Sequence, residues 1–159
     1  MTYVLKRLAK LPPLPYPHPQ QLLYLLNRAY KEGRLPNYQV YVDSPMAVSA
    51  TEIFRIHPEC FNKEVYNFLF AERDPFQFEQ LHMVRTVSES QRLNNMREKA
   101  IIISASGMCE AGRILHHLKN CISRDNNSVL FVGYCAANTL GRRIMDGALE
   151  VRILGDLYP

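Results

Sequence analysis

The stretch Ala100-Ile101-Ile102-Ile103-Ser104-Ala105-Ser106-Gly107-Met108 decides the fold class of this chain. Its three consecutive isoleucines are apolar on both sides of an extended backbone, which is typical of a short buried strand. Ser104 to Gly107 are small residues that can turn tightly and leave backbone N–H groups uncovered. An apolar pattern with helical spacing follows over 108–118. A strand, a small-residue turn and a helix in this order place free amides at a sheet edge, where a phosphate can bind.

The rest of the chain repeats this alternation of strand and helix. Strands are predicted at 39–42, 81–87, 100–104, 128–133 and 150–154, and helices at 20–33, 45–57, 61–71, 88–99, 108–118 and 139–147. Asp43 or Ser44 can cap the helix that starts at Pro45, and Ser88 with Gln91 fits a capping box. Asn138 or Thr139 starts the helix at 139–147. The pattern predicts an α/β domain with a mostly parallel sheet and helices on both faces.

Composition limits the class of protein. The 159 residues are 47% hydrophobic with a net charge of +4, so we expect one globular domain that tolerates an anionic partner. The four cysteines show no paired spacing and no secretory signal is evident, which favours reduced thiols in the cytoplasm. No apolar run approaches the roughly 20 residues that a membrane span needs.

The first 19 residues differ from the remainder. They hold five of the ten prolines, and dense proline removes amide donors and blocks helix formation. Residues 1–19 are therefore predicted to be a poorly ordered proline-rich leader, or alternatively a docking ligand, and residues 20–159 form the domain.

Three turns should meet at one edge of the sheet. Ligands of parallel α/β sheets collect at the carboxyl ends of the strands. The turns 43–45, 104–107 and 133–139 each follow a predicted strand, and we call the surface that they form the rim. Ser104 and Ser106 are candidate phosphate-contacting hydroxyls on it. Asp43 is either a general base or a helix-capping residue.

Several chemistries lack their motifs. The chain has no G-x-x-x-x-G-K-[ST] and no G-x-G-x-x-G, which argues against a classical nucleotide fold. Cys109, Arg113, His117 and Cys121 recur every four residues, but a zinc site needs three or four converging ligands and no second cluster is present. H-E-x-x-H, H-x-H-x-D-H and G-x-S-x-G are also missing.

A basic edge is the remaining signal. Arg142 and Arg143 follow Gly141 in the first turns of the last predicted helix, either as solvated surface residues or as neighbours of the 104–107 turn. Arginine side chains suit phosphate oxygens. With Arg113 and Lys119, these residues give a surface that fits the backbone of a single-stranded nucleic acid.

Three blocks of sequence resemble the β-CASP domain. They are Tyr41-Val42-Asp43-Ser44-Pro45-Met46-Ala47, Ile102 to Ile114, and Phe131-Val132-Gly133-Tyr134 with Thr139-Leu140-Gly141-Arg142-Arg143-Ile144. This domain is the cap inserted in RNA-processing nucleases of the metallo-β-lactamase fold, with bacterial and archaeal members related to the cleavage-and-polyadenylation endonuclease. The resemblance covers roughly residues 20–156 and implies a Rossmann-like α/β cap.

The resemblance also implies partners. In the family, two zinc ions are held by a metallo-β-lactamase core through H-x-H-x-D-H and later histidine motifs, none of which is found here. We therefore expect a cap without the catalytic core, with no catalytic residue and no metal site of its own. Single-stranded RNA lies between cap and core in the family. The residues implied as its contacts are Ser104, Ser106, Gly107, Met108, Gly141, Arg142 and Arg143.

Two other interpretations stay open. A stand-alone nucleotide- or protein-binding domain could use the same turns. His18-Pro19-Gln20-Gln21 stands where relatives carry a Gly-Arg-x-Gln segment, so the chain could instead be a truncated gene with no function of its own. An apolar face left without its core would then favour aggregation or homo-oligomers.

Overall fold

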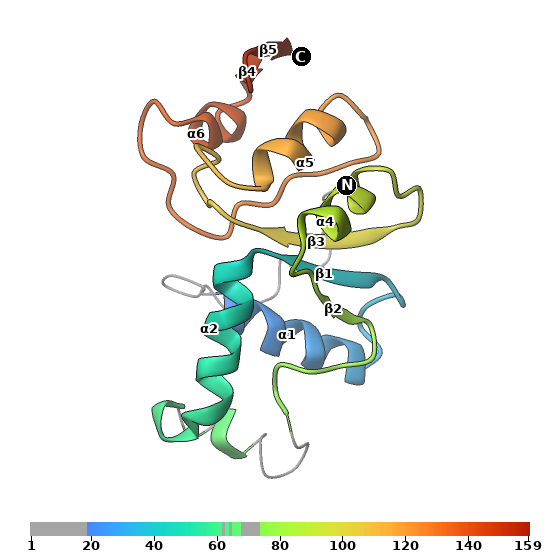
Figure 1. The fold of residues 1–159 in the computed structure, drawn as a ribbon, viewed down its shortest axis with the longest axis vertical. Helices are drawn as coiled ribbons and strands as arrows, with labels where there is room; N and C mark the ends of the chain where they lie inside the picture. The colour runs from blue at the N-terminus through green and yellow to red at the C-terminus, as the bar shows by residue number, and fades with distance from the viewer. Residues whose placement is uncertain (1–18, 62, 64, 68–73) are drawn as a thin grey trace.

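The computed structural model describes residues 19–61, 63, 65–67 and 74–159 (Figure 1). The elements in chain order are α1 (Pro19–Lys31), β1 (Gln39–Asp43), α2 (Pro45–Ile56), the 3₁₀ helix η2 (Pro58–Cys60), β2 (Leu81–Met83), α4 (Val87–Asn94), β3 (Ala100–Ser104), α5 (Ile114–Cys121), α6 (Leu140–Met145), β4 (Val151–Ile153) and β5 (Asp156–Tyr158). The leader expected over 1–19 lies outside the described residues except for Pro19, which begins α1. Part of the helix expected over 61–71 lies outside them as well. No helix within the described ranges has both the length and the apolar composition to cross a bilayer.

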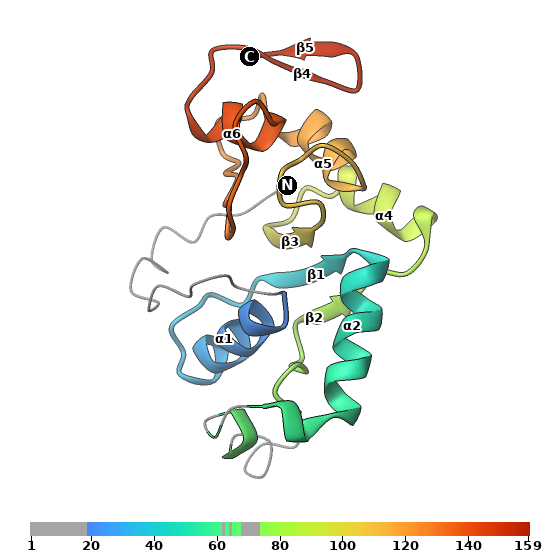
Figure 2. The ribbon, with the colours of Figure 1, turned by 90° about the vertical axis from the view of Figure 1, so that its left-hand side faces the viewer.

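A three-stranded parallel sheet forms the centre of the fold. Its order is β2-β1-β3, with Val40 of β1 opposite Leu81 of β2 and Ile101 of β3. Helices α1 and α2 lie on one side of the sheet, and α4 and α5 lie on the other (Figures 1 and 2). The predicted α/β class with helices on both faces is confirmed.

Alternation along β1 explains how the strand is covered on both sides. Val40 and Val42 are fully buried, and they pack with side chains of α1 and α2 such as Leu26 and Val48, respectively. Tyr41 points to the opposite face and packs in a cluster that contains Ile102 and Leu93 of α4. Because both faces are covered, the strand must be apolar almost throughout, as its sequence predicts.

The final predicted strand lies outside the parallel sheet. Residues 151–153 form β4, which pairs antiparallel with β5 through a tight turn at Leu154 and Gly155. The resulting hairpin packs on α5 and α6 through Val151 and Ile153, which share an apolar cluster with Leu118. Figure 2 shows it at the end of the molecule far from β2.

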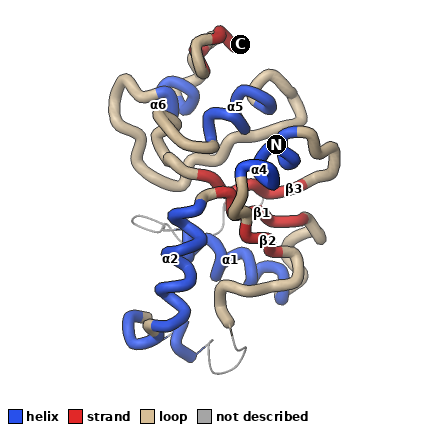
Figure 3. The backbone as a smooth tube through the Cα atoms, in the orientation of Figure 1, coloured by secondary structure: helices blue, strands red, loops and turns tan. Residues whose placement is uncertain are grey.

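The predicted strand at 128–133 is wrong. This segment lies in the long connection between α5 and α6, drawn as loop in Figure 3. Val129 and Phe131 pack against the apolar cluster of α5, α6 and β4, while Leu130 and Val132 are exposed. The segment therefore lies beside β3 without pairing, and a cavity of about 260 Å³ lined by both segments lies between them. The apolar sequence of 128–133 therefore indicated packing correctly, but the backbone of this segment does not pair with a neighbouring strand.

Two helix starts also differ from the sequence pattern. The helix predicted from Met108 begins only at Ile114, because Cys109 and Gly112 adopt positive φ values of 59° and 86° that no α-helix contains. The predicted capping box is displaced by two residues: Thr86 caps α4 and Glu89 closes the box. By contrast, Ser44 caps α2 as one of the two expected residues.

Candidate functional site

The rim predicted from three turns is present in the structure. Asp43 and Ser104 end β1 and β3 as direct neighbours, and the Ser104 hydroxyl donates to the Asp43 carbonyl oxygen at 3.0 Å. On the other side of the rim, the Cys135 thiol donates to the Gly107 carbonyl oxygen at 3.4 Å. The turns 43–45, 104–107 and 133–139 are therefore connected by direct contacts.

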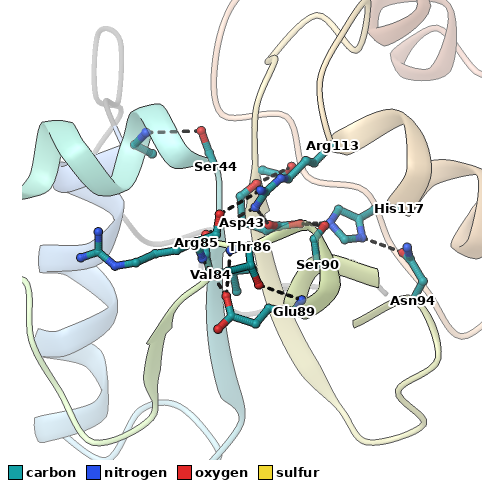
Figure 4. A network of polar contacts seen from close by, with 12 residues as sticks. Asp43, Ser44, Val84, Arg85, Thr86, Glu89, Ser90, Asn94, Arg113 and His117 are labelled. Atoms are coloured by element: carbon teal, nitrogen blue, oxygen red, sulfur yellow. Dashed lines mark hydrogen bonds and ion pairs between the residues drawn. The ribbon is translucent and has the colours of Figure 1, made fainter. Parts of the chain in front are cut away.

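A buried carboxylate lies at the centre of this arrangement (Figure 4). The Asp43 side chain has no solvent exposure. Its Oδ1 accepts a bond from the Arg113 guanidinium at 2.6 Å. Its Oδ2 accepts the Ser90 hydroxyl at 2.5 Å and lies 2.6 Å from His117 Nε2. Three elements, β1, α4 and α5, thus meet on one carboxyl group.

The charge of Asp43 is retained despite burial. Burial on its own raises the pKa of a carboxyl group, but the hydrogen bonds from His117, Ser90 and Arg113 outweigh it and hold the pKa of Asp43 below its ordinary value. The Arg113 cation compensates the carboxylate directly, and His117 is kept in place by Asn94, whose Oδ1 lies 2.8 Å from His117 Nδ1. An ionised, fully hydrogen-bonded carboxylate therefore joins the end of β1 to α4 and α5.

Arg113 extends the same network to the segment after β2. Its guanidinium donates to the carbonyl oxygens of Arg85 at 3.0 Å and Val84 at 3.4 Å. From sequence, Asp43 was expected to be only a base or a cap, and Arg113 was expected in a helical stripe with His117 and on the basic edge. The structure instead pairs Arg113 with the buried Asp43. The sequence did contain one signal for this contact, the i, i+4 spacing of Arg113 and His117. Two polar or cationic side chains on one helix face need a partner such as a carboxylate when they are buried. Asp43, at the end of β1, could have been proposed as that partner.

The loop 105–113 is closed on itself. Ile114 donates its backbone N–H to the Ala105 carbonyl oxygen at 3.4 Å, and Ser106 donates to the Ala111 carbonyl oxygen at 3.2 Å. Gly112 fits between the two ends, and a Cβ there would lie 2.6 Å from the Ala105 carbonyl oxygen. Because Ser104 and Arg113 both bind Asp43, this loop is held at each end by the same residue.

The loop also contacts α6 directly. The Gly141 N–H donates to the Met108 carbonyl oxygen at 2.8 Å, and the Glu110 carboxylate accepts the Leu140 N–H at 2.5 Å. A Cβ on Gly141 would lie 2.9 Å from the Met108 oxygen and 3.0 Å from the Cys135 sulfur. Glycine at position 141 is therefore what permits the two backbones to approach.

Comparison with known proteins identifies the fold family. The Beta-Casp domain matches residues 19–144, which run from the start of α1 to the penultimate residue of α6. The chain belongs to the Beta-Casp domain family.

Relatives of this Beta-Casp domain are named as ribonucleases, RNase J-like proteins or transcription termination factors. Ribonuclease TTHA0252 of Thermus thermophilus is 36% identical over 141 residues, which are 88% of this chain and 32% of that protein. The transcription termination factor FttA of Methanococcus maripaludis is 34% identical over 86% of this chain and 21% of its own length. An RNase J-like protein of Methanocaldococcus jannaschii is 28% identical over 88% of this chain and 31% of its own. The chain thus spans between a fifth and a third of the length of these curated relatives.

The structure places the seven implied RNA contacts on two touching segments of the Beta-Casp domain. Gly107 and Met108 are exposed on the loop 105–113, Ser104 and Ser106 are half-buried, and Gly141 is buried under the loop. Arg142 and Arg143 are exposed on α6. Arg142 forms an ion pair with Asp146 at 2.9 Å, and Arg143 donates to the Glu150 carbonyl oxygen at 3.2 Å. Contact of any of them with RNA stays a prediction.

The Beta-Casp domain offers no metal centre within its described residues. These ranges contain no group of three or more His, Cys, Asp and Glu side chains that could hold a metal ion. Both ring nitrogens of His117 already face Asp43 and Asn94. The two zinc ions that the family resemblance implies therefore do not fit these residues, and no chemical step here involves them.

Proposed function

We propose that this chain is the cap of a zinc-dependent RNA-processing nuclease of the metallo-β-lactamase fold, and that the rim forms one wall of its cleft for single-stranded RNA. Membership of the Beta-Casp family and the names of its relatives support this assignment. In this proposal, a metallo-β-lactamase core outside this sequence binds the zinc ions and cleaves the RNA. The protein is then cytoplasmic, which agrees with the free thiols of its four cysteines.

The single observation that carries the proposal is the contact between Met108 and Gly141. It joins the loop 105–113 to the first turn of α6 through a 2.8 Å backbone hydrogen bond. The exposed side chain of Met108 and the arginines that follow Gly141 are thereby held next to one another. Apolar surface beside fixed positive charge suits a polymer that carries both bases and phosphates.

The partners of the arginines leave them available for a phosphate. The ion pair between Arg142 and Asp146 has side chains that are 47% and 55% exposed. Solvent screens such a pair, so it holds the guanidinium only weakly. A phosphate oxygen can replace the Asp146 carboxylate because the guanidinium presents several donors in one plane. Asp146 in this view keeps Arg142 extended until RNA binds.

The test is binding of a single-stranded oligonucleotide by wild type and by Arg142→Ala with Arg143→Ala. Wild type should bind weakly, and its affinity should fall as salt is raised because bound phosphates release counterions. The double variant should bind less tightly, and its salt slope should be smaller by about 0.7 for each phosphate that it no longer neutralises.

The matched control is Arg92→Ala with Arg97→Ala, which removes two exposed arginines from the last turn of α4 and the loop after it. This control should bind as wild type does. An unchanged affinity and salt slope in the Arg142 and Arg143 variant would remove these residues from the interface. Metal-dependent cleavage of RNA by this chain alone, with zinc or manganese added, would contradict its assignment as a cap that is not catalytic by itself.

A further inference from the structure

We propose that Tyr134 stacks on a base of the bound RNA, directly beside the backbone phosphate that Arg142 contacts. This inference rests on the proposed function and adds a base-binding residue that the seven implied contacts do not contain. Only two phenylalanine or tyrosine side chains in the described part of the chain are exposed, namely Tyr66 at 40% and Tyr134 at 68%. Tyr134 is the one that lies on the rim.

The backbone around Tyr134 is fixed by its neighbour. Cys135 is buried, and its thiol donates to the Gly107 carbonyl oxygen. The same sulfur lies 3.0 Å from the position of a Cβ on Gly141. Tyr134 and Arg142 therefore flank one close contact, each a single residue away from it. The tyrosine is exposed, and the residue that follows it is anchored against the 105–113 loop.

The electrostatic surroundings place the phenol near the arginine as well. The pKa of Arg142 is raised chiefly by its hydrogen bond and charge interaction with Asp146, and to a smaller extent by Tyr134. Met108 lies on the other side of the Gly141 contact and is 37% exposed. An aromatic ring, an apolar side chain and a guanidinium thus lie around the same point of the rim.

This combination fits single-stranded RNA better than other anions. A base needs a flat π-surface on which to stack, and its own phosphate needs a cation within one nucleotide. Inorganic phosphate would use the arginine alone, and a mononucleotide could use the ring and the arginine but none of the neighbouring rim residues. A base in a duplex is already stacked on its neighbours and would not be available to Tyr134. The predicted ligand is therefore an unpaired nucleotide within a strand.

The experiment measures binding of an oligouridine of about 12 nucleotides by fluorescence anisotropy. Tyr134→Ala should bind roughly 5- to 150-fold more weakly than wild type, the range measured for loss of one base–aromatic stack. Tyr134→Phe keeps the ring and should bind as wild type does. Tyr66→Ala is the control for an exposed tyrosine beyond the far end of α2, and it should have no effect. The salt slope should stay unchanged in Tyr134→Ala because no phosphate contact is removed.

An abasic oligonucleotide of the same length separates stacking from other roles of Tyr134. Wild type should bind it as weakly as Tyr134→Ala binds the intact strand, and Tyr134→Ala should lose no further affinity on it. Equal binding of intact RNA by wild type and Tyr134→Ala would overturn the inference and leave the proposed function standing. A loss in Tyr134→Ala that is the same on intact and abasic strands would also overturn it, since the residue would then act through a contact other than a base. No RNA binding by wild type would refute the proposed function and this inference together.

Discussion

Replacing Asp43 by Asn tests whether one buried carboxylate holds β1, α4 and α5 together. The amide has nearly the same shape, but it carries no charge and points an N–H group at donors. Arg113, whose side chain is only 18% exposed, would lose its counterion. Removing one partner from a buried ion pair costs about 3–5 kcal/mol, against the roughly 5–15 kcal/mol that stabilises a typical domain. The variant should be folded but marginal, and urea unfolding followed by circular dichroism at neutral pH measures the difference.

The pH dependence of that difference has a definite sign. The pKa of Asp43 is lower in the folded protein than its ordinary value of 3.8, so the ionised group stabilises the fold above that pH. This stabilisation is lost as the pH falls from about 3.8 through the lower folded pKa. The difference between wild type and Asp43→Asn should therefore be constant near neutral pH and shrink in acid. Other carboxyl groups are the same in both proteins and cancel.

Two further proteins complete this test. Asp156→Asn removes an ion pair with Lys119 whose two side chains are 61% and 40% exposed, and it should change the free energy of unfolding little. Combining Asp43→Asn with Arg113→Gln should cost less than the sum of the single changes by about 0.5–3 kcal/mol, because the orphaned cation is gone. A loss for Asp43→Asn as small as that for Asp156→Asn, or a difference that persists unchanged in strong acid, would refute the role of this carboxylate.

Two other substitutions test the loops around the site. Gly112→Ala should destabilise the domain by more than the roughly 1–2 kcal/mol cost of a left-handed residue, because the new Cβ would lie 2.6 Å from the Ala105 carbonyl oxygen. Gly147 has a similar φ of 73°, but a Cβ there would have no atom within 4 Å. Gly147→Ala should therefore show only the smaller cost in thermal unfolding. Equal losses for the two variants would mean that the loop 105–113 moves to accommodate the new Cβ. Thr86→Ala should lower the free energy of unfolding in urea by about 0.5–2 kcal/mol because it removes the cap of α4, whereas Ser88→Ala should have no effect. A larger loss for Ser88→Ala than for Thr86→Ala would mean that Ser88 is the cap.

The parallel α/β class and the meeting of the turns after β1 and β3 were accessible from sequence because each depends on local signals. The three consecutive isoleucines at 101–103 place apolar side chains on both faces of a strand, so both faces must be covered. Pro45 directly after Ser44 indicates the start of a helix. The carboxyl ends of parallel strands must share an edge. The turns at Asp43 and Ser104 could therefore be placed together before any contact was known. The turn after Gly133 was placed with them because of the strand predicted at 128–133, which does not form.

What sequence reasoning missed depends on long-range pairing. Asp43 and His117 are 74 positions apart, and no spacing rule connects them. The run 128–133 is as apolar as a strand, but hydrophobicity reports burial and not the partner of the backbone. The helix expected from Met108 is interrupted by backbone angles at Cys109, a non-glycine residue for which composition gives no warning.

The outer edge of β3 has a consequence for the protein in solution. Within the described residues, β3 pairs only with β1, so its other side presents backbone N–H and C=O groups with no strand beside them. The sequence Ala-Ile-Ile-Ile-Ser carries no charge and no proline, the features with which proteins usually protect such an edge. The segment 129–133 lies beside this edge, with the cavity of about 260 Å³ between the two. A strand from outside could therefore pair with β3 only by displacing that segment. Edge-to-edge assembly of this chain should accordingly depend on how readily the 129–133 segment moves away from β3.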